Sequence, residues 1–193
     1  MTDTKRCGWC GKDPIYIDYH DNQWGRPVYD SFELFEKLCL DGQQAGLSWI
    51  TVLKKQKNYQ LLFDNFNPER IATYDDDKID ILMQDARIIR NRLKIQSIIK
   101  NARSYLALKE QGINFSDLLW GFVNYAPVQN FIKTDDGVPT TSDASDAMSK
   151  YLKKSGFSFV GSTICYAFMQ AVGMYNDHLI DCPQHRQCLD LSK

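Results

Sequence analysis

The sequence predicts an all-α fold, and three observations support this prediction. Apolar residues recur with helical spacing along most of the chain, capping residues precede several of these stretches, and segments with the alternating pattern of strands are scarce. The chain has 193 residues, of which 44% are hydrophobic and 24% are charged, as in an average soluble globular protein. This length fits one domain or two small lobes that share an interface, and we expect residues 1–193 to form a single domain.

The first half of the chain contains recognisable helix starts. Asp30 and Glu33 form a capping-box pattern, and Ser48 is placed to cap the following helix. Asn67 followed by a proline is typical of an N-cap with proline in the first turn. The apolar stripes of these helices and of two later ones are Phe32, Phe35 and Cys39; Val52, Tyr59 and Phe63; Ile95, Ile98, Ile99, Ala102 and Leu106; and Leu118, Leu119 and Phe122.

The last third of the chain predicts two helices joined by a tight turn. Residues 124–141 contain prolines, a glycine and adjacent aspartates, and they are expected to form a long loop. Residues 142–154 are polar with one apolar side, as in a surface helix, and residues 162–174 form an apolar helix. The sequence between them predicts a hairpin, so that a helix-hairpin-helix unit spans about residues 148–174.

The hairpin contains residues suited to binding one phosphate. Gly156 and Gly161 permit positive φ and close approach of the backbone to a ligand. Amides at the start of the second helix would point at an anion, and Lys153 and Lys154 would add charge. The alternative is an ordinary corner between two helices with a C-capping glycine.

Charge and hydropathy restrict the class of protein. With 23 Lys and Arg against 24 Asp and Glu, the net charge of −1 argues against binding nucleic acid by bulk electrostatics. Any such contact must come from a local basic face, backbone amides and a pocket. No apolar run approaches the roughly 18 residues of a membrane span, and no apolar stretch of a secretion signal follows the N-terminus. We therefore expect a cytoplasmic protein without a membrane partner.

Six cysteines and three histidines suggest a metal site. Without a secretion signal, metal binding or buried free thiols are better explanations of the cysteines than disulfides. Cys39 and Cys165 lie within apolar helical patterns and are expected in the core. The spacing of His178 and Cys182 places both on one face of a helical turn, and Cys7 and His20 could complete a tetrahedral zinc site. Competing ligands lie near both ends of the chain, namely Cys10, His185 and Cys188.

Five segments together resemble the 3-methyladenine DNA glycosylase I family. They are Cys7-Gly-Trp, Tyr16-Ile-Asp-Tyr19-His20-Asp-Asn-Gln-Trp24-Gly, Gly42-Gln-Gln-Ala-Gly-Leu-Ser-Trp49-Ile-Thr-Val-Leu-Lys-Lys, Gly156-Phe-Ser-Phe-Val-Gly161-Ser-Thr-Ile-Cys and Asn176-Asp-His178-Leu-Ile-Asp-Cys182. The resemblance implies a helix-hairpin-helix glycosylase fold in which one structural zinc joins residues 7–20 to residues 178–182. It also selects the zinc ligands, which are Cys7, His20, His178 and Cys182.

The resemblance implies removal of N3-methylated adenine, flipped out of double-stranded DNA, by a monomeric enzyme. A purine methylated at N3 is cationic and leaves easily, so a pocket for a flat cation is the main requirement. Aromatic faces for it are available at Trp9, Tyr16, Tyr19, Trp24 and Trp49, although the same residues could be ordinary core aromatics. Asp41 and Tyr19 are the expected catalytic residues, with Asp41 accepting hydrogen bonds from the exocyclic amino group. The family usually has glutamate there, and aspartate is one methylene shorter.

Further roles follow from the same resemblance. Gln44 and Leu47 are expected to enter the duplex and fill the space of the flipped base. Asp177 lies 16 residues after Gly161, where related superfamily members carry a catalytic aspartate somewhat later, and we interpret it as a ligand-supporting or local hydrogen-bonding residue. No lysine is placed as a Schiff-base nucleophile, so we expect a glycosylase without strand cleavage. A non-catalytic DNA-binding module would leave the aromatic residues and Asp41 unexplained, and four protein ligands leave zinc no open position for hydrolytic chemistry.

Overall fold

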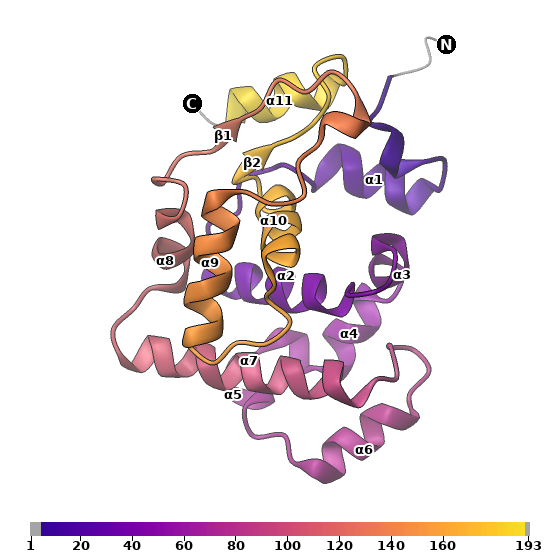
Figure 1. Ribbon diagram of the computed structural model, residues 1–193. Coiled ribbons are helices and arrows are strands. Elements are labelled where there is room, and N and C mark those ends of the chain that lie inside the picture. The colour runs from indigo at the N-terminus through magenta and orange to yellow at the C-terminus, as the bar shows by residue number, and fades with distance from the viewer. Residues whose placement is uncertain (1–4, 192–193) are drawn as a thin grey trace.

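The computed structural model describes residues 5–191, which form a mostly helical molecule, as the sequence predicts (Figure 1). Residues 1–4 and 192–193, with the N-terminal stretch in which no secretion signal was found, lie outside the described residues. The α-helices are α1 Pro14–Asn22, α2 Ser31–Gln43, α3 Trp49–Leu53, α4 Gln56–Leu62, α5 Pro68–Ile71, α6 Asp76–Gln84, α7 Arg92–Glu110, α8 Phe115–Gly121, α9 Asp143–Lys154, α10 Ser162–Ala171 and α11 Pro183–Leu191. Short 3-10 helices occur at Gly8–Cys10, Asp64–Phe66 and Asp135–Gly137.

Side-chain caps fix the starts of the main helices. The Asp30 carboxylate accepts hydrogen bonds from the amides of Phe32 and Glu33, and α2 begins there as predicted. Asn67 caps α5 in the same way, with Pro68 in the first turn, which confirms that prediction too. These starts depend on neighbouring residues alone, which is why the sequence predicts them well.

Two local predictions are wrong. The helix expected after Ser48 is two helices, because the chain closes α3 with an i→i+3 bond from the Lys55 amide to the Val52 carbonyl and then starts α4. The Ser48 hydroxyl contacts Thr51 rather than capping a backbone amide. The loop expected at 124–141 contains β1 (Val128–Gln129), which pairs in parallel with β2 (Tyr175–Asn176). A strand of two residues leaves no periodic pattern in a sequence.

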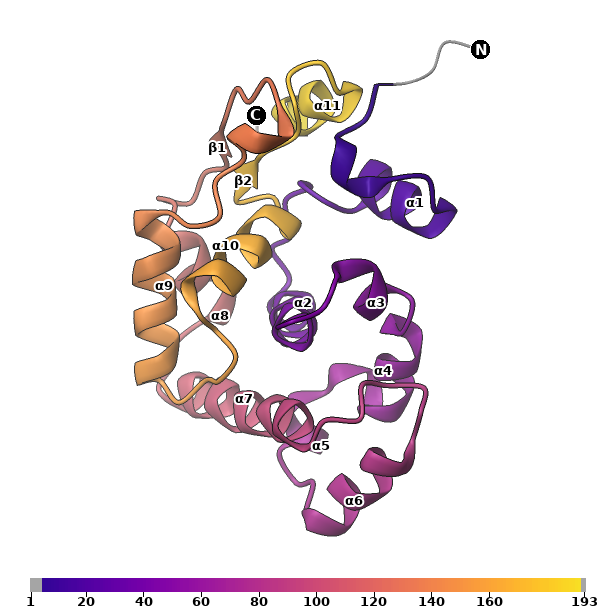
Figure 2. The same cartoon turned by 45° about the vertical axis from the view of Figure 1, so that its right-hand side comes forward.

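Helix α2 passes through the middle of the molecule, with α7 on one side and α10 on the other (Figure 2). Its Leu34, Phe35 and Leu38 are fully buried in the main core. Cys39 and Cys165 also lie in this core, at 2% and 0% exposure, as predicted. Because α2 is central, its last turn, which carries Asp41, ends inside the protein rather than at the surface.

Helices α9 and α10 pack against each other and are joined by the predicted hairpin. Gly156 has φ of +93°, as expected for a glycine that ends a helix. Gly161 has φ of −64°, so its backbone does not require glycine, and the positive φ in this turn falls instead on Phe159. Helix α10 ends at Ala171, three residues earlier than the apolar pattern suggests.

The two ends of the chain meet on one side of α10. In Figure 1 the N-terminal segment with α1 lies beside the C-terminal segment with α11. The Gly25 amide donates to the Gln170 carbonyl at 3.2 Å, and the Val28 amide donates to the Val172 carbonyl at 3.1 Å. No helix among residues 5–191 combines the length and apolar character needed to cross a membrane.

Gly173 provides a test of how the N-terminal segment packs on α10. It has φ of +74°, and a Cβ there would lie 2.5 Å from the backbone of Arg26 and Pro27. We expect Gly173→Ala to lower the free energy of unfolding by about 2–4 kcal/mol, from left-handed strain plus overpacking. Gly112 is the matched control, because it has φ of +75° with open space around it, and its alanine variant should lose only about 1 kcal/mol. Equal losses in urea denaturation would show that the close crossing is absent.

Candidate functional site

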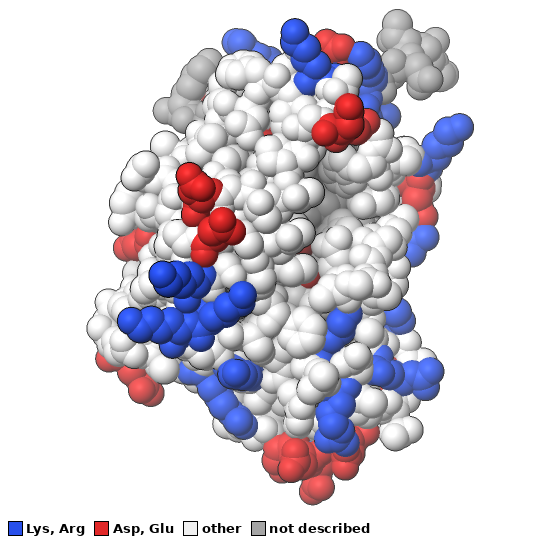
Figure 3. Space-filling view, viewed as in Figure 1, with Lys and Arg blue, Asp and Glu red and all other residues white. Residues whose placement is uncertain are grey.

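A cavity of about 180 Å³ opens between α1, the end of α2 and α10. The six side chains predicted to form a pocket all line it, namely Trp9, Tyr16, Tyr19, Trp24, Asp41 and Trp49. Gln44 lines it as well. In the space-filling view this face of the molecule is hollowed near its centre (Figure 3).

Aromatic rings form the α1 side of the cavity. Tyr16 and Tyr19 are three residues apart on α1, which places them on one face of this helix. Trp9 packs edge-on against Tyr16, with ring centroids 5.0 Å apart, and against Trp24 at 4.9 Å. Trp49, at the start of α3, faces Tyr19 at 5.5 Å. These ring contacts therefore hold the aromatic side chains in place and leave the cavity open.

Asp41 is the only acidic residue among the side chains that line this cavity. It is 3% exposed, and its Oδ2 atom has no hydrogen-bond partner among the described residues. Burial raises the pKa of Asp41 to about 8. The indole Nε1 of Trp49 is also buried without a partner. Buried polar atoms are rarely left unpaired, so these two atoms indicate a place where a ligand supplies the partners.

Four lining residues were missed by the sequence analysis. Ala167, Gln170 and Ala171 lie at i, i+3 and i+4 on one face of α10, and the two alanines leave space that larger side chains would fill. Val138 comes from the long loop, which Asp135 fastens to the Gly8 amide at 3.1 Å. The small residues on an otherwise apolar helix were a usable signal, whereas nothing local indicates Val138.

Asp177 serves as a local hydrogen-bonding residue, one of the two roles considered for it. Its carboxylate is 1% exposed and accepts bonds from Asn130 Nδ2 at 2.7 Å, Tyr166 Oη at 2.8 Å and Gln170 Nε2 at 2.7 Å. It therefore orients Gln170, which lines the cavity, and these three bonds leave none to the neighbouring His178 among the described residues.

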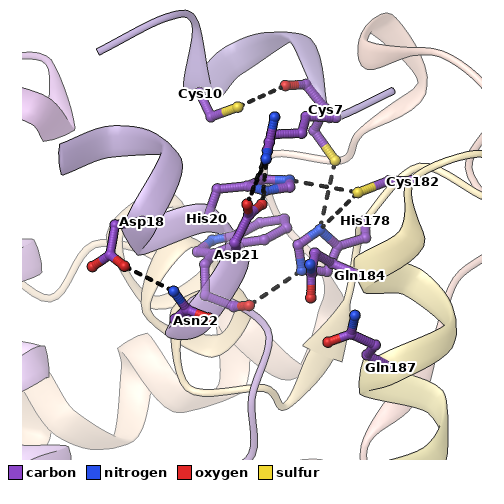
Figure 4. Close-up of polar contacts among 12 residues, drawn as sticks. Cys7, Cys10, Asp18, His20, Asp21, Asn22, His178, Cys182, Gln184 and Gln187 are labelled. Carbon is purple, nitrogen blue, oxygen red and sulfur yellow. Dashed lines mark hydrogen bonds and ion pairs between the residues drawn. The ribbon is translucent and has the colours of Figure 1, made fainter. Parts of the chain in front are cut away.

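The four predicted metal ligands come together in one buried cluster, shown in Figure 4. Their ligand atoms lie within 4.8 Å of one another, although Cys7 and Cys182 are at opposite ends of the chain. Cys7 Sγ is 3.6 Å from His178 Nδ1, and Cys182 Sγ is 3.7 Å from His20 Nε2 and 3.8 Å from His178 Nδ1. A tetrahedral zinc with ordinary bond lengths requires S···N separations of about 3.6 Å, so the donor set fits that ion.

The surroundings orient both histidines for such a role. His20 Nδ1 lies 2.7 Å from the Asp21 carboxylate, which Arg6 also binds, and this leaves Nε2 free to face the cluster. His178 Nε2 lies 3.2 Å from the Trp24 carbonyl, which leaves its Nδ1 free. Each histidine is therefore fixed by an outer hydrogen bond through one ring nitrogen, and the other ring nitrogen faces the cluster.

The two thiols of the cluster are electrostatically coupled. The contact with Cys182, together with burial, raises the pKa of Cys7, and the same contact lowers the pKa of Cys182. A cation between them would allow both to be thiolates. The Leu179 amide also points at Cys7 Sγ, at 3.4 Å.

The competing ligands lie outside the cluster. Cys10 Sγ donates to the Cys7 carbonyl, and His185 Nε2 lies 2.8 Å from the Asn130 carbonyl. One expectation about the cluster is wrong: His178 and Cys182 do not share a helical turn. Residues 178–182 form a turn before α11, closed by a bond from the Cys182 amide to the Leu179 carbonyl, and this turn brings both side chains to the same side.

The residues predicted to contact DNA fall into two groups. Gln44 and Leu47 follow α2; Gln44 lines the cavity, and Leu47 is 41% exposed. Lys153 and Lys154 are exposed at the end of α9, beside the hairpin. Figure 3 shows basic side chains gathered over the lower end of α9, over α7 and around α4, with acidic ones over the start of α9 and at the bottom over α6. The near-zero net charge therefore conceals a local basic face.

Comparison with known proteins gives a consistent result. The sequence model of the family described as Methyladenine glycosylase matches residues 9–185. DNA-3-methyladenine glycosylase of Haemophilus influenzae is 54% identical over 180 residues, which cover 93% of this chain and 97% of the relative. A crystal structure of 3-methyladenine DNA glycosylase I superposes with a TM-score of 0.92 at 53% identity, covering 93% of this chain and 98% of that one.

A second solved structure comes from a more distant relative. The 3-methyladenine DNA glycosylase I of Staphylococcus aureus, whose structure addresses its recognition of 3-methyladenine, is 40% identical with a TM-score of 0.90. It covers 93% of this chain and 95% of its own. From the fold, the cavity and these matches together, the chain belongs to the methyladenine glycosylase family.

Proposed function

We propose that the cavity binds 3-methyladenine flipped out of alkylated double-stranded DNA, and that this enzyme hydrolyses the bond between the base and its deoxyribose. The observation that carries the proposal is Asp41 Oδ2, a buried acceptor without a partner inside an aromatic cavity. An adenine methylated at N3 is a flat cation with an exocyclic amino donor, so it supplies both a charge and a hydrogen bond to this atom.

Asp41 and Tyr19 recognise the base in this proposal. The Asp41 carboxylate accepts the amino protons, and the positive charge of the base stabilises the carboxylate form that burial disfavours. Burial and the nearby Asp41 carboxylate raise the pKa of Tyr19 well above its ordinary value, so Tyr19 is a neutral phenol able to donate a hydrogen bond. Rings from Trp9, Trp24 and Trp49 surround the flat faces of the base.

The reaction needs little acid catalysis because the leaving group carries the positive charge. When the glycosidic bond breaks, its electron pair neutralises the base, and water adds to the sugar carbon and releases one proton to the solvent. No lysine lines the cavity within residues 5–191, which agrees with hydrolysis rather than an imine intermediate and strand cleavage. The main contribution of the enzyme is therefore selection of the cationic base and its removal from the stack.

Contacts to DNA are assigned to the hairpin and to the segment after α2. The first amides of α10 have no side-chain cap, since Gly161 supplies none, and a phosphate can bind there. Lys153 and Lys154 lie nearby on the exposed end of α9. Gln44 and Leu47 enter the duplex and occupy the space of the flipped base.

We also propose that Cys7, His20, His178 and Cys182 hold one zinc ion. The donor types, the separations near 3.6 Å and the oriented histidines support this assignment. Four protein ligands leave no open position, so the ion stabilises the joined termini and takes no part in the reaction. This also argues against a zinc hydrolase, in which the metal must bind water.

Replacement of Asp41 tests the assignment of the pocket. We expect Asp41→Asn to slow single-turnover release of 3-methyladenine from methylated duplex DNA by about 10- to 100-fold, the effect of roughly 1.4–2.8 kcal/mol of lost recognition. Release should persist, because the cationic base leaves readily without help. Asp41→Glu should retain activity, since glutamate is the residue usual in the family. Equal release rates for Asp41→Asn and the wild type would show that Asp41 does not recognise the base.

Metal analysis tests the zinc site. We expect about one equivalent of zinc per chain, and His178→Ala should lose it and lower the thermal midpoint, because metal binding is coupled to folding. His185→Gln is the matched control, since His185 is equally near the C-terminus and lies outside the cluster. It should keep its zinc. Less than half an equivalent in folded wild-type protein would contradict the assignment.

A further inference from the structure

Lys94 is a buried lysine whose ammonium group is directed at the end of α2. Its side chain comes from the first turn of α7, and the residue is 6% exposed. Nζ donates to the carbonyl of Gln43 at 2.7 Å and to the carbonyl of Ala45 at 2.7 Å. No ion pair to a carboxylate is found for it within the described part of the chain. Burying the charge of a lysine is costly, so its position at the end of α2 requires a structural explanation.

The carbonyls at the end of α2 explain why the lysine is needed. A helix leaves its last carbonyls without partners, and here the turn that follows satisfies some of them. The carbonyls of Asp41 and Gln44 accept from the amides of Gln44 and Leu47, at 3.1 and 2.6 Å. The carbonyls of Gln43 and Ala45 accept from no backbone amide, and Lys94 satisfies both. Its charge also complements the negative end of the helix dipole.

A second set of bonds makes this contact reciprocal. The side-chain amide of Gln43, which is fully buried, donates to the Lys94 carbonyl at 3.1 Å. Its oxygen accepts from Tyr59 Oη at 3.2 Å, and that hydroxyl accepts from the Ile89 amide at 3.1 Å. The end of α2 is therefore fixed to α7, to α4 and to the segment before α7.

The segment held in this way, residues 44–47, is short, and its backbone amides otherwise make turn bonds to carbonyls of residues 41–44. Gly46 has φ of +74° with no atom within 4 Å of a Cβ built there, and Leu47 is 41% exposed. Gly46 therefore contributes no packing that would set the direction of the segment, and a large part of Leu47 is exposed. The bond from Lys94 to the Ala45 carbonyl lies at its base, next to the turn.

We propose that Lys94 is a positioning residue for base flipping: its ammonium fixes residues 44–47, so that Gln44 and Leu47 enter the DNA in register with a base bound at Asp41. This rests on the proposed function, and it adds a residue that touches neither base nor DNA. Burial lowers the pKa of Lys94, in keeping with a site formed by neutral carbonyls.

The test separates the flipping segment from the pocket. Lys94→Met keeps an unbranched side chain that is one atom shorter and removes the ammonium with both of its hydrogen bonds. Lys100→Met, at an exposed lysine on the same helix, is the matched control. We expect Lys94→Met to slow single-turnover release of 3-methyladenine from duplex DNA about 10-fold or more. Its affinity for free 3-methyladenine, followed by tryptophan fluorescence, should stay within about 3-fold of wild type, because the pocket walls remain.

A double-mutant cycle with Leu47→Ala asks whether Lys94 acts through the segment. If it does, the double variant should be little slower than the slower single variant, since both changes remove the same event. Lys94→Arg, which keeps charge and donors, is run in parallel and should lose less activity than Lys94→Met while showing the same coupling. This variant keeps the test valid if Lys94→Met does not fold.

Three results would overturn the inference. The first is a release rate for Lys94→Met equal to that of Lys100→Met. The second is a double variant of Lys94 and Leu47 whose loss of rate equals the product of the two single losses. The third is a loss of affinity for free 3-methyladenine as large as the loss of release rate. Failure of the wild type to release 3-methyladenine would instead refute the proposed function, so the two failures are distinguishable.

Discussion

The meeting of the two chain ends is the constraint on which the cavity depends. Four of its aromatic side chains lie between residues 9 and 24, a segment that is bounded by Cys7 and contains His20. His178 reaches the carbonyl of Trp24 directly, and Gly25 bonds to the last turn of α10. The terminal cluster and these backbone bonds together hold the aromatic wall opposite α10. A closed metal site suits this purpose, because it supplies geometry without competing chemistry.

The cavity lining contains buried polar atoms without hydrogen-bond partners, which is energetically unfavourable and indicates a ligand site. Most buried polar groups in this protein are paired, including Asp177 with three donors and Lys94 with two acceptors. Asp41 Oδ2 is left unpaired in the lining of the cavity, where a bound ligand can supply its partner. Two polar atoms of the cavity lining, Asp41 Oδ2 and Trp49 Nε1, thus lack partners, while the rings around them pack against one another. Under the proposed function, selection for cationic purines follows from this arrangement more directly than from the net charge of the chain.

The sequence predicts those features that depend on neighbouring residues. Asp30 and Asn67 cap helices through amides two and three residues away, so α2 and α5 begin where expected. The break between α3 and α4 is closed by the local bond from the Lys55 amide to the Val52 carbonyl, and the pairing of Val128 with Tyr175 depends on a contact distant in sequence. No periodic pattern reveals either feature. Spacing suggests a metal site but does not choose between Cys7 and Cys10; the family resemblance makes that choice. Lys94 looks like any surface lysine on a helix, because its burial depends on where α2 ends.

The free energy of unfolding of wild type and Asp41→Asn, measured from pH 4 to pH 9, tests most directly whether Asp41 is buried without a partner. The pKa of Asp41 is about 8 in the folded protein, against about 4 in an unfolded chain, so the folded state holds this proton more tightly. The resulting stability is complete below pH 4 and is lost as the pH rises to about 8. The two proteins should therefore be similar near pH 4, and the variant should become more stable by roughly 2–5 kcal/mol at pH 8. Parallel curves across this range would contradict the account.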